Sequence, residues 1–518
     1  MSSSSSSERR SSSRRHHNHR HHSTPKVVSK HSCCVVGGGI SGMAVAARMA
    51  AAGYSVTLYE AGPELGGKLT DYQWQDFRFD KGPSLFTMPE HLNELFMACG
   101  KRLDDYLQYD RLELVTRYFY PEGTRVDAWS EPARFAQELK QQVGEDQARV
   151  RSYLKRAELM YETTAPVFLH KSLHDWRNLL RFSTFLRVLR IPWLGINTTM
   201  HRFNKKWFKH ERTVQLFDRF ATYNGSDPYR APATLNLISH IELNKGAFYP
   251  RGGMIAIRNA MANLLSEMGV QVRLNTRVDR LFVHEGKVKG VVTGEEKDVH
   301  QLVISGIDIM QAERRLVPKH YRNKRRLKTE LSTSAIIFHW AVKGTHAPLD
   351  LHNIFFTSHY HREFEYLRKG KLAADPTLYV YVSSKANASD APAGHENWFV
   401  MVNTPAHQEQ DWDQWVAEVR EYAHERLSEA LGTDTKELVL HESVMDPRDL
   451  ERNTGSVGGA IYGPASNNKW AAFLRQSNKH SKLKGLYFVG GSVHPGGGIP
   501  LCLLSAKITT ELITGKSS

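Results

Sequence analysis

The feature that most constrains this chain is a glycine-rich turn that joins a short apolar run to a helical segment. Residues 33–36 (CCVV) form the apolar run, which is typical of a buried parallel strand, and residues 37–42 (GGGISG) follow at once. The Ala- and Met-rich stretch 40–52 favours a helix that ends at Gly53, and the stretch 55–59 (SVTLY) favours a second strand. This order of strand, turn, helix and strand predicts a βαβ unit and therefore an α/β fold.

The turn has the pattern G-x-G-x-x-G, and each of its glycines has its own physical reason. Gly37 permits the tight turn, Gly39 lets a pyrophosphate approach the backbone, and Gly42 lets helix and strand pack closely. Glu60 ends the second predicted strand, where a carboxylate can accept hydrogen bonds from ribose hydroxyls. Together these residues predict a dinucleotide site and disfavour NADP, because the carboxylate would repel a 2′-phosphate. The alternative is a glycine turn that binds no ligand.

A second glycine pair follows the second predicted strand, in residues 65–68 (LGGK). A cation beside a glycine pair can place another positive group near the pyrophosphate, which would favour FAD over NAD. On its own such a sequence is more often a plain turn. Its position beside the nucleotide motif weakens that alternative.

The composition excludes several classes of protein. The 518 residues are 41% apolar and 24% charged, as in folded soluble proteins, and only the Ser-, Arg- and His-rich residues 1–30 have the composition of a disordered tail. The four cysteines form no C-x-x-C pair and have no metal-ligand spacing, so we expect neither a disulfide framework nor a metal site. No stretch approaches the roughly 18 apolar residues of a membrane span, and the start has no secretory signal. We therefore expect a cytoplasmic protein.

The rest of the chain predicts a return to α/β structure after a helical middle. Residues 130–240 are largely helical in pattern, and a Gly-Gly turn at 252–253 then precedes a helix to Met268. A terminal strand at 486–489 runs into Gly490-Gly491 and a last helix. The other predicted strands are 270–274, 280–283, 287–292 and 302–305, and, for a second sheet, 335–342, 378–382 and 398–402.

Four stretches resemble the FAD-dependent carotenoid desaturases of the bacterial phytoene-desaturase type. They are VVGGGISGMAVAARMAAAGYSVTLYEAGPELGGKLT at 35–70, FRFDKGPSLFTMPE at 77–90, FYPRGGM at 248–254 and LYFVGGSVHPGGGIPLCLLSAKI at 486–508. They stand in the family's order, so the resemblance covers essentially all of 31–515. The last stretch is the most specific, because the first glycine motif belongs to many flavoproteins.

Within this family the chain is similar to the 1-hydroxycarotenoid 3,4-desaturase branch. The stretches that carry this similarity are ATYNGSDPYRAP, NWFVMVNTP, NTGSVGGAIYG and GGSVHPGGGIPLC. Phytoene desaturase is the near neighbour and stays open. The resemblance implies an FAD-binding Rossmann-like flavoprotein with a discontinuous nucleotide domain, at 31–110, 241–315 and 471–518, and a mixed α+β substrate domain at 111–240 and 316–470.

The resemblance also implies which residues hold FAD. The ADP-ribose half would contact Gly37, Gly39, Gly42 and Glu60, and the backbone of Val278, on the strand after the long helix, would meet the adenine. Gly67 and Lys68 match the pyrophosphate motif, where many members carry Arg; Lys keeps the charge but loses the bidentate geometry. The block that lines the ribityl chain and the flavin ring would be Gly490, Gly491, Ser492, Gly498, Ile499 and Pro500.

The implied reaction introduces a C=C bond into a polyene by hydride transfer to FAD, with a quinone or oxygen as the final electron acceptor. Asp80 and His494 are the titratable residues nearest the matched stretches and are the candidate catalytic groups. Each has a plainer interpretation, since Asp80 lies in a turn sequence and His494 precedes a proline and a glycine run. A carotenoid cis–trans isomerase or polyene saturase on the same fold stays open. Intact Gly37, Gly39, Gly42 and Glu60 argue against a flavin-free lipid carrier.

An excess of basic residues points to an anionic partner. Lys and Arg number 69 against 54 Asp and Glu, a net charge of +15. Residues 171–212 interleave Lys and Arg with aromatic residues, and Leu179, Phe182, Leu186 and Leu189 would share one helical face. This pattern predicts docking to anionic lipids on the inner face of the cell membrane, where a carotenoid substrate would reside. The alternative is a solvated helix; nucleic-acid binding is disfavoured, because no recognised module accompanies the charge.

Overall fold

One half of the molecule is built around the predicted βαβ unit, which the structure confirms. In this computed structural model, which describes residues 31–169, 195, 197–467 and 475–516, β1 (Ser32–Val36) leads through the glycine turn into α1 (Ile40–Ala51), and β2 (Ser55–Tyr59) follows. β1 pairs in parallel with β2, Val35 opposite Leu58, and on its other side with β14 (Leu302–Ser305). The full sheet has the order β10-β2-β1-β14-β20, with β10 at Gln271–Arg273 and β20 at Leu486–Phe488.

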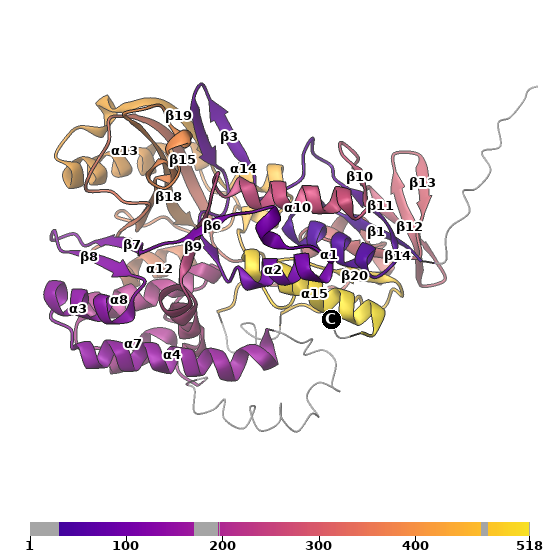
Figure 1. Cartoon of the computed structure of the whole chain (residues 1–518), viewed down its shortest axis with the longest axis horizontal. Helices are drawn as coiled ribbons and strands as arrows, with labels where there is room; N and C mark the ends of the chain where they lie inside the picture. The colour runs from indigo at the N-terminus through magenta and orange to yellow at the C-terminus, as the bar shows by residue number, and fades with distance from the viewer. Residues whose placement is uncertain (1–30, 170–194, 196, 468–474, 517–518) are drawn as a thin grey trace, which may run out of the picture.

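Both faces of this parallel sheet are covered, which explains why β1 is an unbroken apolar run. Cys33 and Val35 pack against one core, formed with α1, α2 (Glu90–Ala98), α10 (Ile255–Glu267) and α15 (Ile499–Thr514). Cys34 and Val36 point into the opposite core. That core is shared with a three-stranded sheet of β11 (Arg280–His284), β12 (Lys287–Thr293) and β13 (Glu296–Val299), seen at the far right of Figure 1.

The other half contains a seven-stranded mixed sheet. Its order is β19-β15-β18-β17-β16-β7-β8, and the strands are β19 (Val439–Met445), β15 (Ser334–Lys343), β18 (His395–Thr404), β17 (Leu378–Tyr381), β16 (His352–Phe355), β7 (Leu114–Phe119) and β8 (Arg125–Trp129). Ile336 on β15 packs toward α13 (Trp412–Leu431), while Ile337 points to the opposite face. That opposite face turns toward the site described below.

A group of helices lies below this sheet (Figure 1). They are α3 (Pro132–Val143), α4 (Gln147–Phe168), α7 (Met200–Trp207), α8 (Glu211–Asp218) and α12 (Tyr360–Arg368). Their apolar faces form one core with β7 and β8. Most of the predicted membrane-docking segment 171–212 lies outside the described residues, including the predicted apolar face. In its described part, Phe203, Trp207 and Phe208 pack around Tyr153, so these aromatic side chains contribute to the core.

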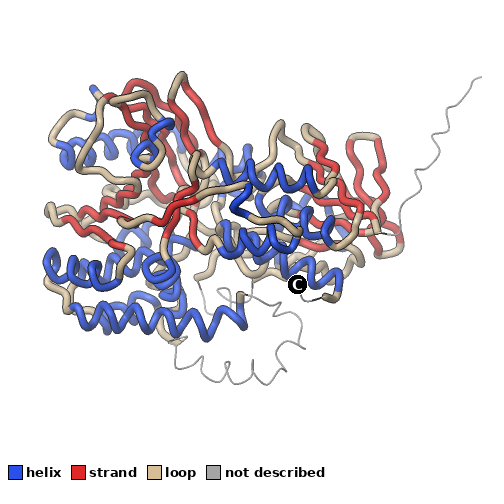
Figure 2. Tube along the Cα trace, in the orientation of Figure 1, coloured by secondary structure: helices blue, strands red, loops and turns tan. Residues whose placement is uncertain are grey.

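Short strands connect the two halves, as Figure 2 shows in red at the centre of the molecule. β9 (Ala247–Pro250) pairs with β5 (Phe86–Thr87) and β6 (Tyr109–Arg111), and the hairpin of β3 (Asp71–Trp74) and β4 (Phe77–Asp80) rises beside the seven-stranded sheet. α14 (Pro447–Thr454) closes the same region.

The strands predicted from sequence are all present, some of them longer or shorter by one or more residues at their ends. Val278 was expected on a strand, but it lies in the irregular segment between β10 and β11. The predicted domain boundaries at 110, 240, 315 and 470 stay predictions. The five-stranded sheet takes its strands from 32–59, 271–305 and 486–488, and the seven-stranded sheet from 114–129 and 334–445.

Candidate active site

The glycine turn after β1 combines two close backbone contacts with one open position. Gly37 has φ +97°, a conformation that favours glycine, and its N–H donates to the carbonyl of Tyr59 at 2.8 Å. A Cβ atom at Gly42 would lie 1.9 Å from the carbonyl oxygen of Gly37, so only glycine fits there. A Cβ at Gly39 would meet nothing nearer than 3.9 Å, the Cα of Gly67. The protein therefore leaves space beside Gly39, at the start of α1.

Glu60 is held in place at the end of β2. One carboxylate oxygen accepts the N–H of Gly38 and the other accepts the N–H of Gly62, each at 2.7 Å. The side chain lines the same cavity as Gly37 and Gly39. A carboxylate at this place can accept hydrogen bonds from the hydroxyls of a ribose.

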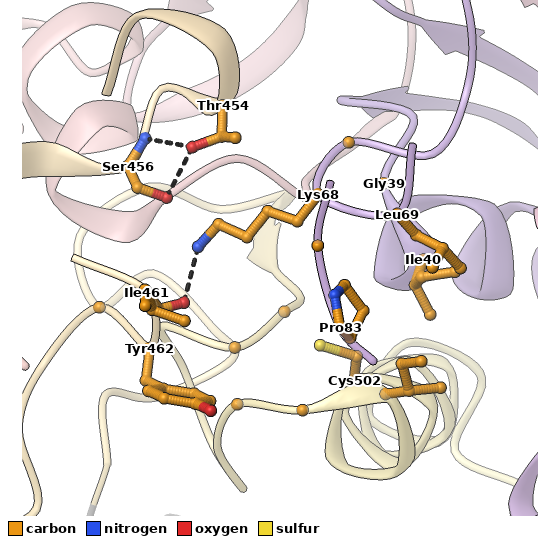
Figure 3. A pocket seen from close by; sticks show the side chains of 18 of the residues that line it. Gly39, Ile40, Lys68, Leu69, Pro83, Thr454, Ser456, Ile461, Tyr462 and Cys502 are labelled. Atoms are coloured by element: carbon orange, nitrogen blue, oxygen red, sulfur yellow. Dashed lines mark hydrogen bonds between the residues drawn. The ribbon is translucent and has the colours of Figure 1, made fainter. Parts of the chain in front are cut away.

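Lys68 reaches across the site from the second glycine pair. Its Nζ donates to the carbonyl of Ile461 at 2.7 Å (Figure 3). Burial lowers the pKa of Lys68, and the nearby carboxylate of Asp308 partly opposes this effect. Lys68 lines the cavity together with Gly67. Its ammonium group, however, is hydrogen-bonded to Ile461, and this bond joins the two halves of the molecule.

The block after β20 forms the wall of the cavity at the start of α15. All of the residues of this block that were predicted to bind FAD line the cavity: Gly490, Gly491, Ser492, Gly498, Ile499 and Pro500. The hydroxyl of Ser492 accepts the N–H of Ile309 at 2.9 Å. Arg475, which no sequence motif singled out, donates to the carbonyl of Gly491 at 2.7 Å and to that of Tyr462 at 3.2 Å. Burial lowers the pKa of this guanidinium, whose hydrogen bonds fix the position of the block.

One cavity of about 920 Å³ joins these parts to the seven-stranded sheet. Its lining includes Gly37, Gly39, Glu60 and Val278 from the predicted nucleotide site, and residues 490–492 and 495–502 from the block after β20. The apolar part of the lining comes from the seven-stranded sheet and the segments around it: Leu235, Leu237, Ile238, Ile241, Ile337, Ile354, Phe399, Met401, Met445 and Leu450. Such a cavity suits a ligand with a polar nucleotide end and, beside it, a second ligand that is long and apolar.

Several polar groups interrupt the apolar part of the lining. Arg219 is buried and paired with Glu242 at 3.1 Å, and it also donates to the hydroxyl of Tyr118 at 2.6 Å. A separate chain of hydrogen bonds runs from Ser84 through the hydroxyl of Tyr379, 2.6 Å away, to Nδ1 of His352, a further 2.9 Å away. The sequence patterns named none of these residues, because no fixed spacing connects them.

The two predicted catalytic residues do not line the cavity. Asp80 is 2% exposed; Arg78 donates to it at 2.8 Å, and so does the hydroxyl of Tyr381. Burial raises its pKa and the charge of Arg78 opposes that shift. His494 is 1% exposed, and its carbonyl accepts hydrogen bonds from Asn478 and Ser505. The geometry supports a structural role for both and gives neither a position next to a reacting atom.

The residues present fit bound FAD. The open position at Gly39 gives a pyrophosphate room beside the free N–H groups at the start of α1, and Glu60 lies where a ribose would be. The same cavity is lined by the other predicted residues, which are Gly67, Val278 and the predicted members of the block from Gly490 to Pro500. Gly42 is the exception, because it packs the helix against the turn and does not line the cavity.

Comparison with known proteins agrees with this geometry. A family model described as flavin containing amine oxidoreductase matches residues 40–514. The chain belongs to this family. It is an FAD-dependent oxidoreductase, and it falls in the carotenoid-desaturase branch that its motifs resemble.

Two relatives are similar to this chain over most of its length. A 1-hydroxycarotenoid 3,4-desaturase from Flavobacterium sp. (strain P99-3) is 41% identical over 92% of this chain and 97% of the relative. A 4,4'-diaponeurosporene oxygenase from Staphylococcus aureus (strain MRSA252) is 31% identical over 93% of this chain and 97% of the relative.

Solved structures share the fold at low sequence identity. Putrescine oxidase bound to putrescine has a TM-score of 0.62 at 15% identity, covering 94% of this chain and 99% of that one. An oxidoreductase from Methanosarcina mazei has a TM-score of 0.61 at 16% identity, covering 94% and 100%. The predicted flavoprotein fold is therefore confirmed.

Proposed function

We propose that this enzyme introduces a C=C bond into a carotenoid, and specifically that it is a 1-hydroxycarotenoid 3,4-desaturase. The observation that carries the proposal is that one cavity is lined both by the block from Gly490 to Cys502 and by apolar side chains of the seven-stranded sheet. A long polyene can lie along these side chains with one C–C bond at the block. The 41% identity to a 1-hydroxycarotenoid 3,4-desaturase supports the choice of substrate.

The reaction removes two hydrogen atoms from neighbouring carbons of the substrate. When bound, FAD supplies the two-electron acceptor for the hydride that leaves one carbon. The proton on the neighbouring carbon is acidified by the allylic cation character next to the polyene and passes to water, and a quinone or oxygen finally takes the two electrons. The apolar lining, which includes Ile337, Phe399 and Met401, orients the chain.

Asp80 and His494 have no part in this proposal, because neither lines the cavity. A flavin-free lipid carrier is excluded by membership in the flavin-containing family. Phytoene desaturation and polyene isomerisation or saturation would use the same cavity. A second candidate, oxygenation of a terminal group of the polyene, has the support of the relative that is 31% identical.

Product analysis tests the proposal and separates these candidates. FAD-loaded enzyme would be given a 1-hydroxycarotenoid in liposomes with a quinone, and the products resolved by chromatography and mass spectrometry. We expect a product with two hydrogen atoms fewer and a longer chromophore. A product of unchanged mass would indicate isomerisation, a product with two more hydrogen atoms would indicate saturation, and a product that gains oxygen would indicate the oxygenase. Turnover of phytoene in place of the hydroxylated substrate would assign a phytoene desaturase.

We further propose that the enzyme takes its substrate from a membrane surface, as a peripheral protein on the inner face of the cell membrane. No helix in the described part of the chain is long and apolar enough to cross a membrane. Leu169 lines the cavity, and the basic and aromatic segment 171–212 follows it in the sequence. The proposal predicts that the protein floats with anionic liposomes and much less with neutral ones, and that about 0.5 M salt releases it. Equal binding to both liposomes would contradict it.

A further inference from the structure

The reaction proposed above places a strict condition on how the substrate is recognised. In a 1-hydroxycarotenoid that is desaturated between C3 and C4, only two C–C bonds separate the hydroxyl-bearing carbon from C3. A group that recognises the hydroxyl must therefore lie in the cavity close to the block from Gly490 to Cys502, and it must have a hydrogen bond left to give or accept. A group at the distant end of the apolar lining cannot meet this condition.

The hydrogen-bonded chain of Ser84, Tyr379 and His352 lines the same cavity as the block from Gly490 to Cys502. Ser84 follows Gly82 and Pro83, and Gly82 packs so closely that a Cβ there would lie 1.8 Å from the carbonyl oxygen of Lys68. Pro83 lines the same pocket as Lys68, Tyr462 and Cys502, and all four are labelled in Figure 3. This segment therefore joins the cofactor site to the hydroxyl of Tyr379 through Ser84.

Tyr462 provides a second link between this chain and the block. Its ring packs against Gly497, where a Cβ would lie 2.8 Å from the ring carbon Cδ1. Tyr462 is also among the groups that influence the pKa of Tyr379, which burial raises. His352 and Tyr379 therefore line the same cavity as Tyr462 and the block from Gly490 to Cys502.

His352 has one ring nitrogen with an unused hydrogen bond. The residue is 3% exposed and lines the cavity, and its Nδ1 is 2.9 Å from the hydroxyl of Tyr379. Its Nε2 is buried without a hydrogen-bond partner among the residues that the structure describes. A buried polar atom of this kind is costly unless a ligand satisfies it.

The chemistry of His352 specifies an uncharged ligand. Burial, assisted by the charge of Arg219, lowers its pKa to about 3, so the imidazole is neutral. The charge of the nearby Arg219 guanidinium is balanced by Glu242, which lies 3.1 Å from its Nη2. A hydroxyl group both donates and accepts, so it satisfies Nε2 in either tautomer of the ring.

The other polar groups of the cavity are less suitable. Glu363 accepts hydrogen bonds from the backbone N–H of Thr377 at 3.1 Å and from its hydroxyl at 2.6 Å. Tyr360 also lines the cavity and its hydroxyl lacks a partner among the described residues, but its ring packs with Phe356 and Phe364 in the helical core. Among the described residues, neither Glu363 nor Tyr360 is hydrogen-bonded to Tyr379, which connects His352 to Ser84.

We propose that Nε2 of His352, held in place by Tyr379 and Ser84, binds the C1 hydroxyl of the polyene and so selects the hydroxylated substrate. This inference rests on the desaturase function proposed above. It makes His352 a substrate-binding residue that determines specificity and leaves hydride transfer to the bound cofactor. The same hydrogen bond fixes how far the polyene enters the cavity, and therefore which C–C bond reacts.

The test compares two polyenes that differ only in the C1 hydroxyl, using FAD-loaded protein. His352→Phe keeps a flat ring between Tyr379 and Tyr381 but removes the hydrogen bond. We expect kcat/KM for the hydroxylated polyene to fall about 10- to 100-fold, while kcat/KM for the other polyene changes less than about threefold. Tyr379→Phe should lower the same preference to a smaller extent, because it removes only the support of His352.

Two matched variants control for damage to the fold. His339→Phe replaces another buried histidine of the same sheet that does not line the cavity, and Tyr381→Phe removes a hydroxyl two residues from Tyr379 that is bonded to Asp80. Both should keep the wild-type preference, even if they lower stability. A His352→Phe variant that keeps this preference within about threefold would overturn the inference and leave the desaturase function intact.

A binding measurement separates failure of the inference from failure of the proposed function. The hydroxylated polyene and its counterpart would be titrated into FAD-loaded protein without an electron acceptor, and binding followed by quenching of tryptophan fluorescence. Tighter binding of the hydroxylated polyene that His352→Phe abolishes would support the inference, even if no desaturation is seen. Equal affinity of the wild-type protein for both polyenes would overturn it.

Discussion

Replacing Gly39 by alanine should separate cofactor binding from folding. Gly39 has φ −71° and ψ 177°, a backbone conformation that any residue adopts. The new Cβ would have its nearest protein atoms at 3.9 Å and 4.0 Å, which are ordinary contact distances. The free energy of unfolding of flavin-free Gly39→Ala should therefore change by less than about 1 kcal/mol, with a small gain because alanine restricts the unfolded chain.

The same methyl group should weaken FAD binding strongly. It would occupy the space beside the start of α1 that the structure leaves open for a pyrophosphate. Each hydrogen bond between a backbone N–H and a charged phosphate that is lost costs about 1.5–3 kcal/mol. The dissociation constant for FAD should therefore rise by about 10- to 150-fold.

Gly42→Ala provides the matched control, since the same methyl group is added three residues further along. Here the Cβ would lie 1.9 Å from the carbonyl oxygen of Gly37, so α1 or the turn must move. Overpacking of this kind costs about 1–3 kcal/mol or more, with or without the cofactor. Gly42→Ala should therefore lower the stability of the flavin-free protein, which Gly39→Ala should not.

Two measurements on each variant decide the outcome. Urea denaturation of the flavin-free protein gives the free energy of unfolding, and titration with FAD, followed by quenching of flavin fluorescence, gives the affinity. If Gly39→Ala bound FAD as tightly as the wild-type protein does, the glycine turn would not be the pyrophosphate site. Equal stability of Gly42→Ala and the wild-type protein would refute the packing argument.

Two further predictions follow from buried charged or titratable groups. Arg475→Met should raise the dissociation constant for FAD about tenfold in the same titration, because the carbonyls of Gly491 and Tyr462 lose their donor; unchanged affinity would contradict this. Burial lowers the pKa of His339 from 6.5 to about 4, so the unfolded state binds more protons between these values and stability is lost as the pH falls. Between pH 8 and pH 5 His339 accounts for a loss of about 2 kcal/mol, and urea denaturation of His339→Phe should show a loss that is smaller by about this amount.

The sequence predicts best those elements whose characteristic residues lie close together along the chain. The apolar run of β1, the glycines after it and the terminal Glu60 stand within thirty residues and form one unit, β1 to β2, with parallel pairing. By contrast, β16 is four residues long and pairs in parallel with β7, Asn353 opposite Arg117, across more than two hundred positions of sequence. No local periodicity of the sequence predicts such a strand or its pairing.

The same distinction applies to the site. Gly37, Gly39 and Glu60 belong to a motif whose spacing is fixed by the turn, and the other cofactor residues were implied by the family resemblance. All of the predicted cofactor residues except Gly42 line the cavity. Lys68 was expected at the pyrophosphate, but sequence could not foresee its hydrogen bond to Ile461, because the two residues approach only when the halves of the molecule pack.

Single polar residues in the second half could not be predicted for a similar reason. His352 is a lone histidine in an unremarkable stretch, and it meets Ser84 only through Tyr379, on a neighbouring strand. Arg475 likewise belongs to no motif, although it holds the cofactor block. Asp80 is a candidate from sequence because it is one of the titratable residues nearest the matched stretches, but in the structure it lies on β4 and is buried in an ion pair with Arg78.

The most direct test of the central claim is an anaerobic reduction of the flavin by substrate. Protein lacking residues 1–30 would be loaded with FAD and mixed, without any electron acceptor, with liposomes that contain a 1-hydroxycarotenoid, and its absorbance recorded. The flavin bands should bleach as one equivalent of desaturated product forms per bound FAD. Flavin that stays oxidised while the hydroxycarotenoid remains unchanged would contradict the assignment of this enzyme as a 1-hydroxycarotenoid desaturase.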